Sequence, residues 1–206
     1  MNFFQQARVN MVKNQVMTNK VFDEHIMHAM EQVPRHLFVD DSQYTIAYSD
    51  ARIKVGGGRE LLAPDVFARM VQAAEINENS KVLDVAVGYG YSTAIIAQLA
   101  GSVIGIESVT QFAAKAAELV AKWGGDKASL KQAGLLEGAP EAAPFDAIIV
   151  NGAIKQMPTN LLSQLQEGGR LIVIEEIGGV KKVVKYTNIN SNYSRSELFD
   201  AYADFI

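Results

Sequence analysis

The stretch that decides the fold is residues 81–94, which read KVLDVAVGYGYSTA. Its first five residues, Lys81 to Val85, are rich in β-forming side chains and predict a strand. Gly88 and Gly90 then predict a tight turn, and helix-forming residues follow directly. A strand, a glycine turn and a helix in immediate succession are typical of a ligand-binding βα unit, because the helix presents free backbone N–H groups at the turn.

Short β-rich runs alternate with helical runs on the carboxyl side of this unit. We predict strands over 102–106, 147–150 and 170–174, and helices over 93–99, 110–123 and 158–166. The strand over 147–150 has no polar alternation, which indicates burial on both faces. This order predicts an α/β fold with a mostly parallel, Rossmann-like sheet. Residues 181–186 and 197–206 flank an Asn/Ser-rich turn and predict a C-terminal antiparallel hairpin.

The amino-terminal part has a different pattern, with helical spacing over 3–15, 23–32 and 63–74 and loop chemistry over 38–59. The chain length suits one domain. We therefore expect residues 1–206 to form one domain, with 1–75 as a helical and loop extension and 76–206 as the Rossmann-like core.

The composition restricts the function classes. The 206 residues are 49% hydrophobic, and the net charge of −4 argues against nucleic acid as a partner. The absence of cysteine excludes disulfides and thiolate chemistry and favours a cytoplasmic location. We expect no signal peptide and no membrane-spanning segment. His25 and His28 share a predicted helix face, but no third ligand is evident, so we expect no metal site.

Two carboxylates narrow the choice of ligand. Glu107 follows the next predicted strand, roughly 20 residues downstream, where its oxygens can accept both hydroxyls of a ribose. Asp84, beside the glycine turn, can hold a cationic amine. Thr93 stands where a dinucleotide fingerprint has its third glycine, so NAD is the second choice. We predict S-adenosylmethionine as the cofactor.

Several segments in order resemble the protein-L-isoaspartate O-methyltransferase family. They include Val33-Pro34-Arg35 with Phe38-Val39, Ala47-Tyr48 with Asp50, Asp84 to Tyr91, and Gln164 to Leu171. The resemblance implies a methyltransferase sheet with added N-terminal helices, S-adenosylmethionine as cofactor, and a protein or peptide carboxylate as substrate. It also implies cofactor-binding positions at Asp84, Ala86, Gly88, Gly90, Glu107 and Gly134.

The departures from the family lie at positions that should face the ligands. The family motif G-x-G-Q-T-I-S corresponds to GGGRELL here, so Arg59, Glu60 and Leu62 become the substrate-side residues. Leu62 stands at the family serine, and no catalytic residue is assigned. Ala86 stands at a family glycine. Arg59 can bind an acidic substrate, although a solvated or internal ion pair is the favoured interpretation.

Two hypotheses follow. The first is an S-adenosylmethionine-dependent O-methyltransferase that binds its cofactor but has weak or absent isoaspartyl activity. The alternative is a degenerate, non-catalytic binding or interaction protein with the same fold. Asp84 and Glu107 favour the first hypothesis, whereas Leu62 and Ala86 favour the second, and the sequence does not identify the methyl acceptor.

Overall fold

A computed structural model describes residues 2–206. Its α-helices are α1 (Phe3–Met11), α2 (Glu24–Gln32), α3 (Pro64–Ala74), α4 (Tyr91–Leu99), α5 (Thr110–Gly124) and α6 (Thr159–Leu162). Its strands are β1 (Ile53–Gly56), β2 (Arg59–Leu61), β3 (Lys81–Val85), β4 (Ser102–Glu107), β5 (Ala128–Gln132), β6 (Phe145–Ile154), β7 (Leu165–Ile177), β8 (Val180–Ile189) and β9 (Asn192–Asp200). Shorter π- or 3₁₀-helical segments cover Val12–Val16, Met17–Asn19, Arg35–Phe38, Asp41–Ile46, Gly125–Lys127 and Pro140–Ala142.

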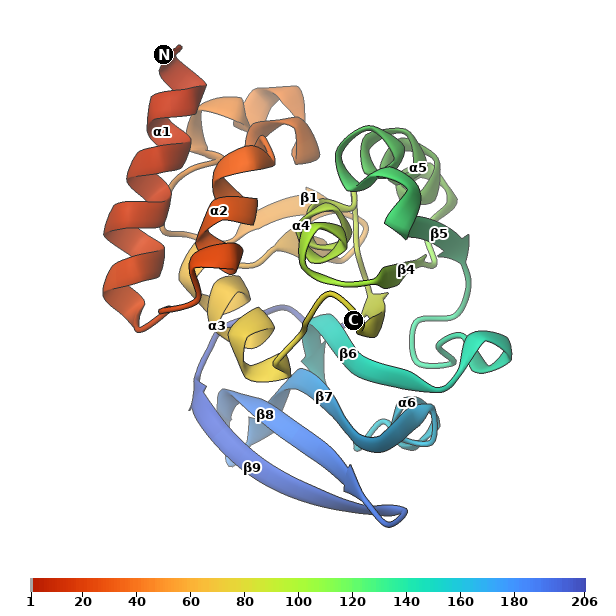
Figure 1. Ribbon diagram of the computed structural model, residues 1–206. Helices are drawn as coiled ribbons and strands as arrows, with labels where there is room; N and C mark the ends of the chain where they lie inside the picture. The colour runs from red at the N-terminus through yellow and green to blue at the C-terminus, as the bar shows by residue number, and fades with distance from the viewer. Residues whose placement is uncertain (1) are drawn as a thin grey trace.

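A seven-stranded sheet runs through the molecule in the order β5-β4-β3-β6-β7-β8-β9. The first five strands in this order are parallel, and β8 and β9 are antiparallel. Figure 1 shows the antiparallel strands β8 and β9 at the bottom of the view, α4 near its centre and α5 at the upper right, close to β5. The predicted α/β class with a mostly parallel sheet and an antiparallel end is therefore confirmed.

Both faces of the sheet are covered, as a parallel sheet requires. Alternate residues of β3 point to opposite sides, so Val82 packs in one hydrophobic cluster with the N-terminal helices. Leu83 and Val85 pack in a second cluster with Leu161 and Leu162 from α6. The glycine turn after β3 lies between these two layers.

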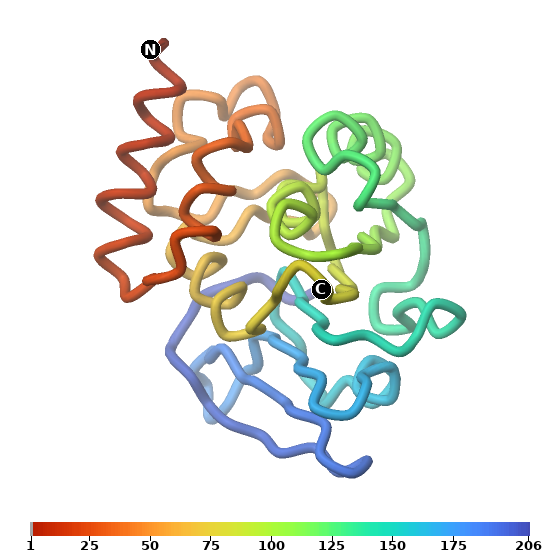
Figure 2. The backbone as a smooth tube through the Cα atoms, viewed as in Figure 1, coloured from red at the N-terminus to blue at the C-terminus, as the bar shows by residue number. Residues whose placement is uncertain are grey.

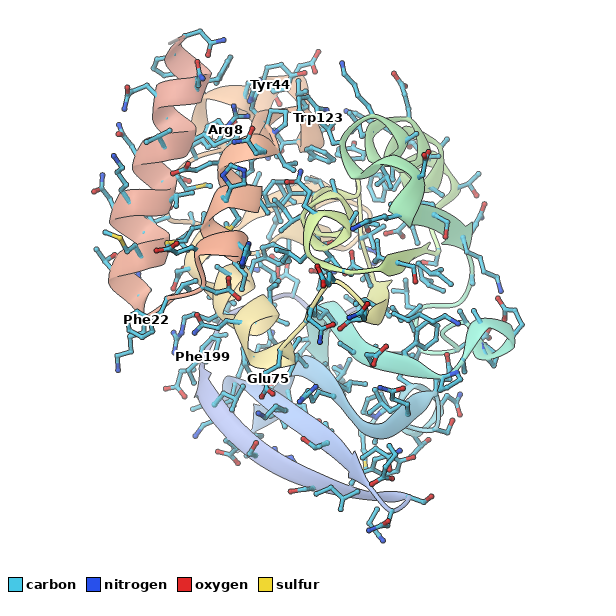
Figure 3. All side chains as sticks on the ribbon, in the orientation of Figure 1. Arg8, Phe22, Tyr44, Glu75, Trp123 and Phe199 are labelled. Carbon is cyan, nitrogen blue, oxygen red and sulfur yellow. The ribbon has the colours of Figure 1, made fainter. Side chains whose placement is uncertain are left out.

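Helix α3 secures the antiparallel end of the sheet. Arg69 lies 3.4 Å above the ring of Phe199 on β9. Glu75, labelled in Figure 3 near Phe199, pairs with Arg170 on β7 at 2.7 Å and with Lys185 on β8 at 3.4 Å. Within residues 2–206, no helix combines the length and apolar character that crossing a membrane requires.

Two predicted elements differ from the structure. The helix predicted over 158–166 is limited to Thr159–Leu162, and β7 already begins at Leu165. Leu165 pairs with Phe145 on β6, and its carbonyl accepts from the Asn188 side chain at 3.1 Å, so sheet contacts outweigh local helix propensity. The C-terminal antiparallel pair is present and its first strand lies within β8, but the second strand, predicted over 197–206, is β9 over Asn192–Asp200.

The residues predicted as loop contain a second, two-stranded sheet formed by β1 and β2. Ile53 pairs with Leu61, and Lys54 pairs with Glu60. Gly56 ends β1, Gly57 and Gly58 form the turn, and the three glycines have φ values of 85°, 54° and 72° that favour glycine. We refer to residues 53–61 as the hairpin.

Arg35 joins the N-terminal extension to the segment after the hairpin. Its side chain is fully buried, and Nε donates to the carbonyl of Ala47 while Nη2 donates to the carbonyl of Leu62, both at 2.8 Å. Its guanidinium carbon lies 5.0 Å from the ring centroid of Tyr91 on α4. Burial lowers the pKa of Arg35. One side chain thus links segments that are distant in the sequence.

We expect Arg35→Met to lower the free energy of unfolding by about 3 kcal/mol, because two buried carbonyls lose their donors. Lys13→Met, a matched change at an exposed position, should alter it by less than about 0.5 kcal/mol. Urea denaturation measures both values. Equal effects of the two substitutions would contradict the structural role given to Arg35.

Candidate functional site

The glycine turn after β3 has the backbone geometry of a close-approach loop. Ala86, Gly88 and Gly90 have φ values of 62°, 54° and 89°, so three of five residues are left-handed. The left-handed region costs a non-glycine residue about 1–2 kcal/mol, and Ala86 carries this cost at the family's glycine position. Gly90 is also the residue that precedes α4.

Glu107, the last residue of β4, turns its carboxylate toward this loop and is 1% exposed. Its Oε2 accepts from the N–H of Gly88 at 2.9 Å. Its Oε1 accepts from the N–H groups of Ser108 at 2.8 Å and Val109 at 3.0 Å. Three backbone donors therefore fix the carboxylate beside the glycine turn.

Arg59 of β2 reaches the same carboxylate. Its Nε lies 3.1 Å from Oε1 and 3.0 Å from Oε2 of Glu107, and its Nη2 lies 3.0 Å from Oε1. Nη2 also donates to Ser108 Oγ at 2.8 Å. Arg59 is only 7% exposed. The guanidinium therefore covers the carboxylate positions where the sequence predicted ribose hydroxyls.

Glu60, the next residue, has different partners from Arg59, although it also lines the small cavity beside Ala86. Its carboxylate is buried and lies 2.6 Å from Nη1 of Arg52, and it accepts from the backbone N–H of Asp204 at 2.7 Å. Figure 2 shows the C-terminal segment returning to the middle of the molecule, where Glu60 fastens it. Glu60 is thus engaged by protein groups rather than directed at a substrate.

Asp84 is fully buried and is held by neutral donors. Its Oδ2 accepts from Ser92 Oγ at 2.6 Å and Thr93 Oγ1 at 2.7 Å, and its Oδ1 accepts from Asn151 Nδ2 at 2.7 Å. Burial raises the pKa of Asp84 to about 6, and the three hydrogen bonds oppose that rise. Asp84 therefore ties β3, α4 and β6 together, and a bound amine would have to displace some of these donors.

Leu62 is 3% exposed and lines a small cavity with Ala86, Tyr91 and Asn151. The cavity volume is about 10 Å³, which holds one water molecule at most. The substrate-side residues are therefore close to the glycine turn but enclose no room for a substrate in this conformation.

Gly134 lies after β5, in the loop expected near an adenine. A methyl group on Gly134 would stand 2.7 Å from the carboxyl carbon of Glu137. The carboxylate of Glu137 thus lies against this loop, although Gly134 itself occupies the family's acidic position.

Ser92 and Asn151 are site residues that the sequence reasoning missed. Asn151 follows the apolar run over 147–150, and an isolated polar residue after a buried strand is a signal that could have identified it. Ser92 lies in the first turn of α4, directly beside Asp84. Both side chains become functional candidates only through that contact.

A much larger cavity, of about 470 Å³, lies elsewhere. Its lining includes Gln72, Glu75, Asn79 and Gln98, near the amino end of β3. Ligands of open α/β sheets bind outside the carboxyl ends of the strands. The glycine turn and Glu107, at the carboxyl ends of β3 and β4, therefore remain the candidate site, although the cavity beside them is smaller.

S-adenosylmethionine does not fit this site as it stands. Arg59 covers the acceptor positions of Glu107, and the adjoining cavity is far smaller than the roughly 300 Å³ or more that small-molecule sites require. The residue types around the turn suit an adenosyl ligand, so the obstruction is the position of Arg59 rather than a lack of binding groups.

The sheet order, the antiparallel end, the glycine turn and the strand-end carboxylate define a protein of the Rossmann-like methyltransferase class. The model of the protein-L-isoaspartate(D-aspartate) O-methyltransferase family matches residues 6–199. The chain therefore belongs to the protein-L-isoaspartate O-methyltransferase family.

Individual relatives agree with this assignment. A protein-L-isoaspartate O-methyltransferase 1 of Syntrophobacter fumaroxidans is 38% identical over 170 residues, which cover 82% of this chain and 79% of the relative. A protein-L-isoaspartate O-methyltransferase of Opitutus terrae is 37% identical over 174 residues, which cover 82% of this chain and 75% of the relative.

Two solved structures show the same fold at low identity. A protein-L-isoaspartate O-methyltransferase superposes with a TM-score of 0.85 at 19% identity over 98% of this chain and 65% of that chain, so this chain spans less than two thirds of it. A Plasmodium falciparum structure, described as a protein-L-isoaspartate O-methyltransferase in complex with S-adenosyl-L-homocysteine, gives 0.83 at 22% identity, covering 96% and 97%.

The raised pKa of Asp84 predicts a pH-dependent stability. Between about pH 4, near the pKa of an unfolded aspartate, and about pH 6, the folded state binds more protons than the unfolded state. Stability from this group is therefore lost as pH rises. We expect the free energy of unfolding of the wild type, relative to Asp84→Asn, to fall by up to about 3 kcal/mol from pH 4 to 7.

Urea denaturation at several pH values measures this difference. Asp126→Asn, at an exposed position, is the matched control and should give no comparable slope. A pH-independent difference between wild type and Asp84→Asn would show that Asp84 does not titrate in this range.

Proposed function

We propose that this protein is an S-adenosylmethionine-dependent O-methyltransferase that acts on a carboxylate of a protein or peptide in the cytoplasm. The observation that carries the proposal is Glu107, fixed by the Gly88 N–H beside the glycine turn, within a family match that spans residues 6–199. The names of the relatives, protein-L-isoaspartate O-methyltransferases, support the reaction class.

The residues around the glycine turn have different roles in binding the cofactor. Once Arg59 leaves, Glu107 can accept the ribose hydroxyls while its backbone donors hold it in place. Gly88 and Gly90 permit close approach of the ligand to the backbone. Because the cofactor supplies an activated methyl group, a carboxylate oxygen needs alignment and exclusion of water rather than a general base.

Leu62 supports an altered preference for the methyl acceptor. Its buried side chain gives an apolar wall where the family has a serine hydroxyl. A substrate group that hydrogen-bonds to that hydroxyl would lose its partner here. We therefore propose that cofactor binding is retained and that activity on isoaspartyl peptides is weak.

Thermal unfolding with S-adenosylhomocysteine tests the cofactor proposal. A ligand that binds only the folded state stabilises it by about 2.7 kcal/mol at a hundredfold excess over Kd, so the melting temperature should rise. Glu107→Gln should lose this rise, whereas Glu118→Gln, on an exposed face of α5, should keep it. No rise in the wild type at saturating ligand would end the proposal.

Transfer of a labelled methyl group to an isoaspartyl peptide tests the role of Leu62. We expect Leu62→Ser to raise the rate at least about tenfold, because one hydrogen bond to a buried substrate group contributes about 1.4 kcal/mol or more. Leu62→Ala opens the same space without a hydroxyl and should not give this gain. Equal rates for the two variants would refute a role for the hydroxyl.

A further inference from the structure

We propose that Arg59 sets the cofactor affinity of this protein by competing with the ribose of the ligand for Glu107. This inference rests on the proposed function and assigns to Arg59 the role of an internal competitor. The side chain belongs to the protein itself, so the competition is present at every ligand concentration.

The hydrogen bonds at Glu107 show why the two groups exclude each other. The N–H groups of Gly88, Ser108 and Val109 take part of the acceptor capacity of the carboxylate. The Nε of Arg59 lies 3.1 and 3.0 Å from the two oxygens and takes up the acceptor capacity that these donors leave. A carboxylate offers about four lone-pair positions. A ribose diol and the Arg59 fork therefore cannot bind Glu107 together.

The burial of the ion pair makes the competition effective. Arg59 and Glu107 have side-chain exposures of 6% and 1%, so water does not screen their attraction as it does at the surface. A guanidinium stranded in this position without its carboxylate would be strongly destabilised. Arg59 must therefore swing toward solvent when a neutral ribose takes its place.

The hairpin holds Arg59 over the glycine turn, and movement of the hairpin can release Arg59 from Glu107. Gly57 packs against Phe112 of α5 so closely that a methyl group there would stand 2.7 Å from the ring. Beneath the hairpin, a methyl group on Gly88 would stand 3.7 Å from the Cβ of Arg59. The glycine turn of the hairpin thus lies directly on the candidate site, and lifting its tip away from Phe112 removes Arg59 from Glu107.

Tyr89 lies within the same cover. Its ring packs edge-on against Phe112 with centroids 5.1 Å apart, and its hydroxyl donates to Asp40 Oδ1 at 2.8 Å. The ammonium group of Lys115 lies 4.1 Å from the ring centroid of Tyr89. Tyr89 therefore ties the glycine turn to α5 and to Asp40, while Arg59 of the hairpin is the cation that contacts Glu107.

Isothermal titration with S-adenosylhomocysteine tests the competition. Arg59→Gln introduces the glutamine of the family motif and leaves Glu107 its three backbone donors. The variant should therefore fold, and thermal unfolding checks that it does. We expect it to bind at least about tenfold more tightly than the wild type, because the binding-competent population increases. Arg59→Lys keeps the positive charge and should stay closer to the wild type.

Lys54→Gln is the matched control, since Lys54 is an exposed cation on the same hairpin and pairs with Asp204 rather than Glu107. It should bind like the wild type. Equal or weaker binding by Arg59→Gln overturns the competition while the cofactor proposal stands. Failure of both the wild type and Arg59→Gln to bind overturns the cofactor proposal and the competition together.

Hydrogen exchange gives a second test on the unmodified protein. If lifting of the hairpin tip is what takes Arg59 off Glu107, the amides of residues 53–61 should exchange faster when S-adenosylhomocysteine is bound. Unchanged or slower exchange of these amides in the bound wild type would overturn the release of Arg59 through the hairpin.

Discussion

The buried ion pair between Arg59 and Glu107 determines whether the candidate site is covered or open to a ligand. Removing two charges from water is costly, and the pair is favourable only because its geometry satisfies most of the donors and acceptors involved. The two-pronged approach of Arg59 and the backbone donors around Glu107 meet this requirement. The same contacts that stabilise the glycine turn therefore close it to other ligands.

The central fold could be predicted because its signals are local. Residues 81–94 contain a strand, a turn and a helix start in sequence, and Glu107 follows the next strand, so its place at the sheet edge comes from topology alone. The hairpin could not be predicted in this way. Its strands are four and three residues long and its tip is the run Gly56-Gly57-Gly58, a pattern that local rules assign to a loop.

Side-chain partners were harder to predict because they depend on contacts between distant segments. Arg59 and Glu107 are 48 residues apart, and Asp84 and Asn151 are 67 residues apart. The sequence correctly indicated carboxylates at the ends of β3 and β4, and it assigned them to a ribose and a cationic amine, whereas side chains of the protein bind both in this structure. Asp84 accepts hydrogen bonds from two hydroxyls and one amide, and it does not pair with a cation. The position of an aspartate in the sequence does not distinguish these two environments.

The matched and the departing segments of the family motif have different structural roles. Arg35 and Ala47 belong to matched segments, and their hydrogen bond is part of the frame that carries the site. Arg59, Glu60 and Leu62 are the departures, and all three lie on or next to β2. Each is fastened to another part of the protein: Arg59 to Glu107, Glu60 to the C-terminal segment, and the Leu62 carbonyl to Arg35. The departures on and next to one short strand are therefore all held by contacts within the protein.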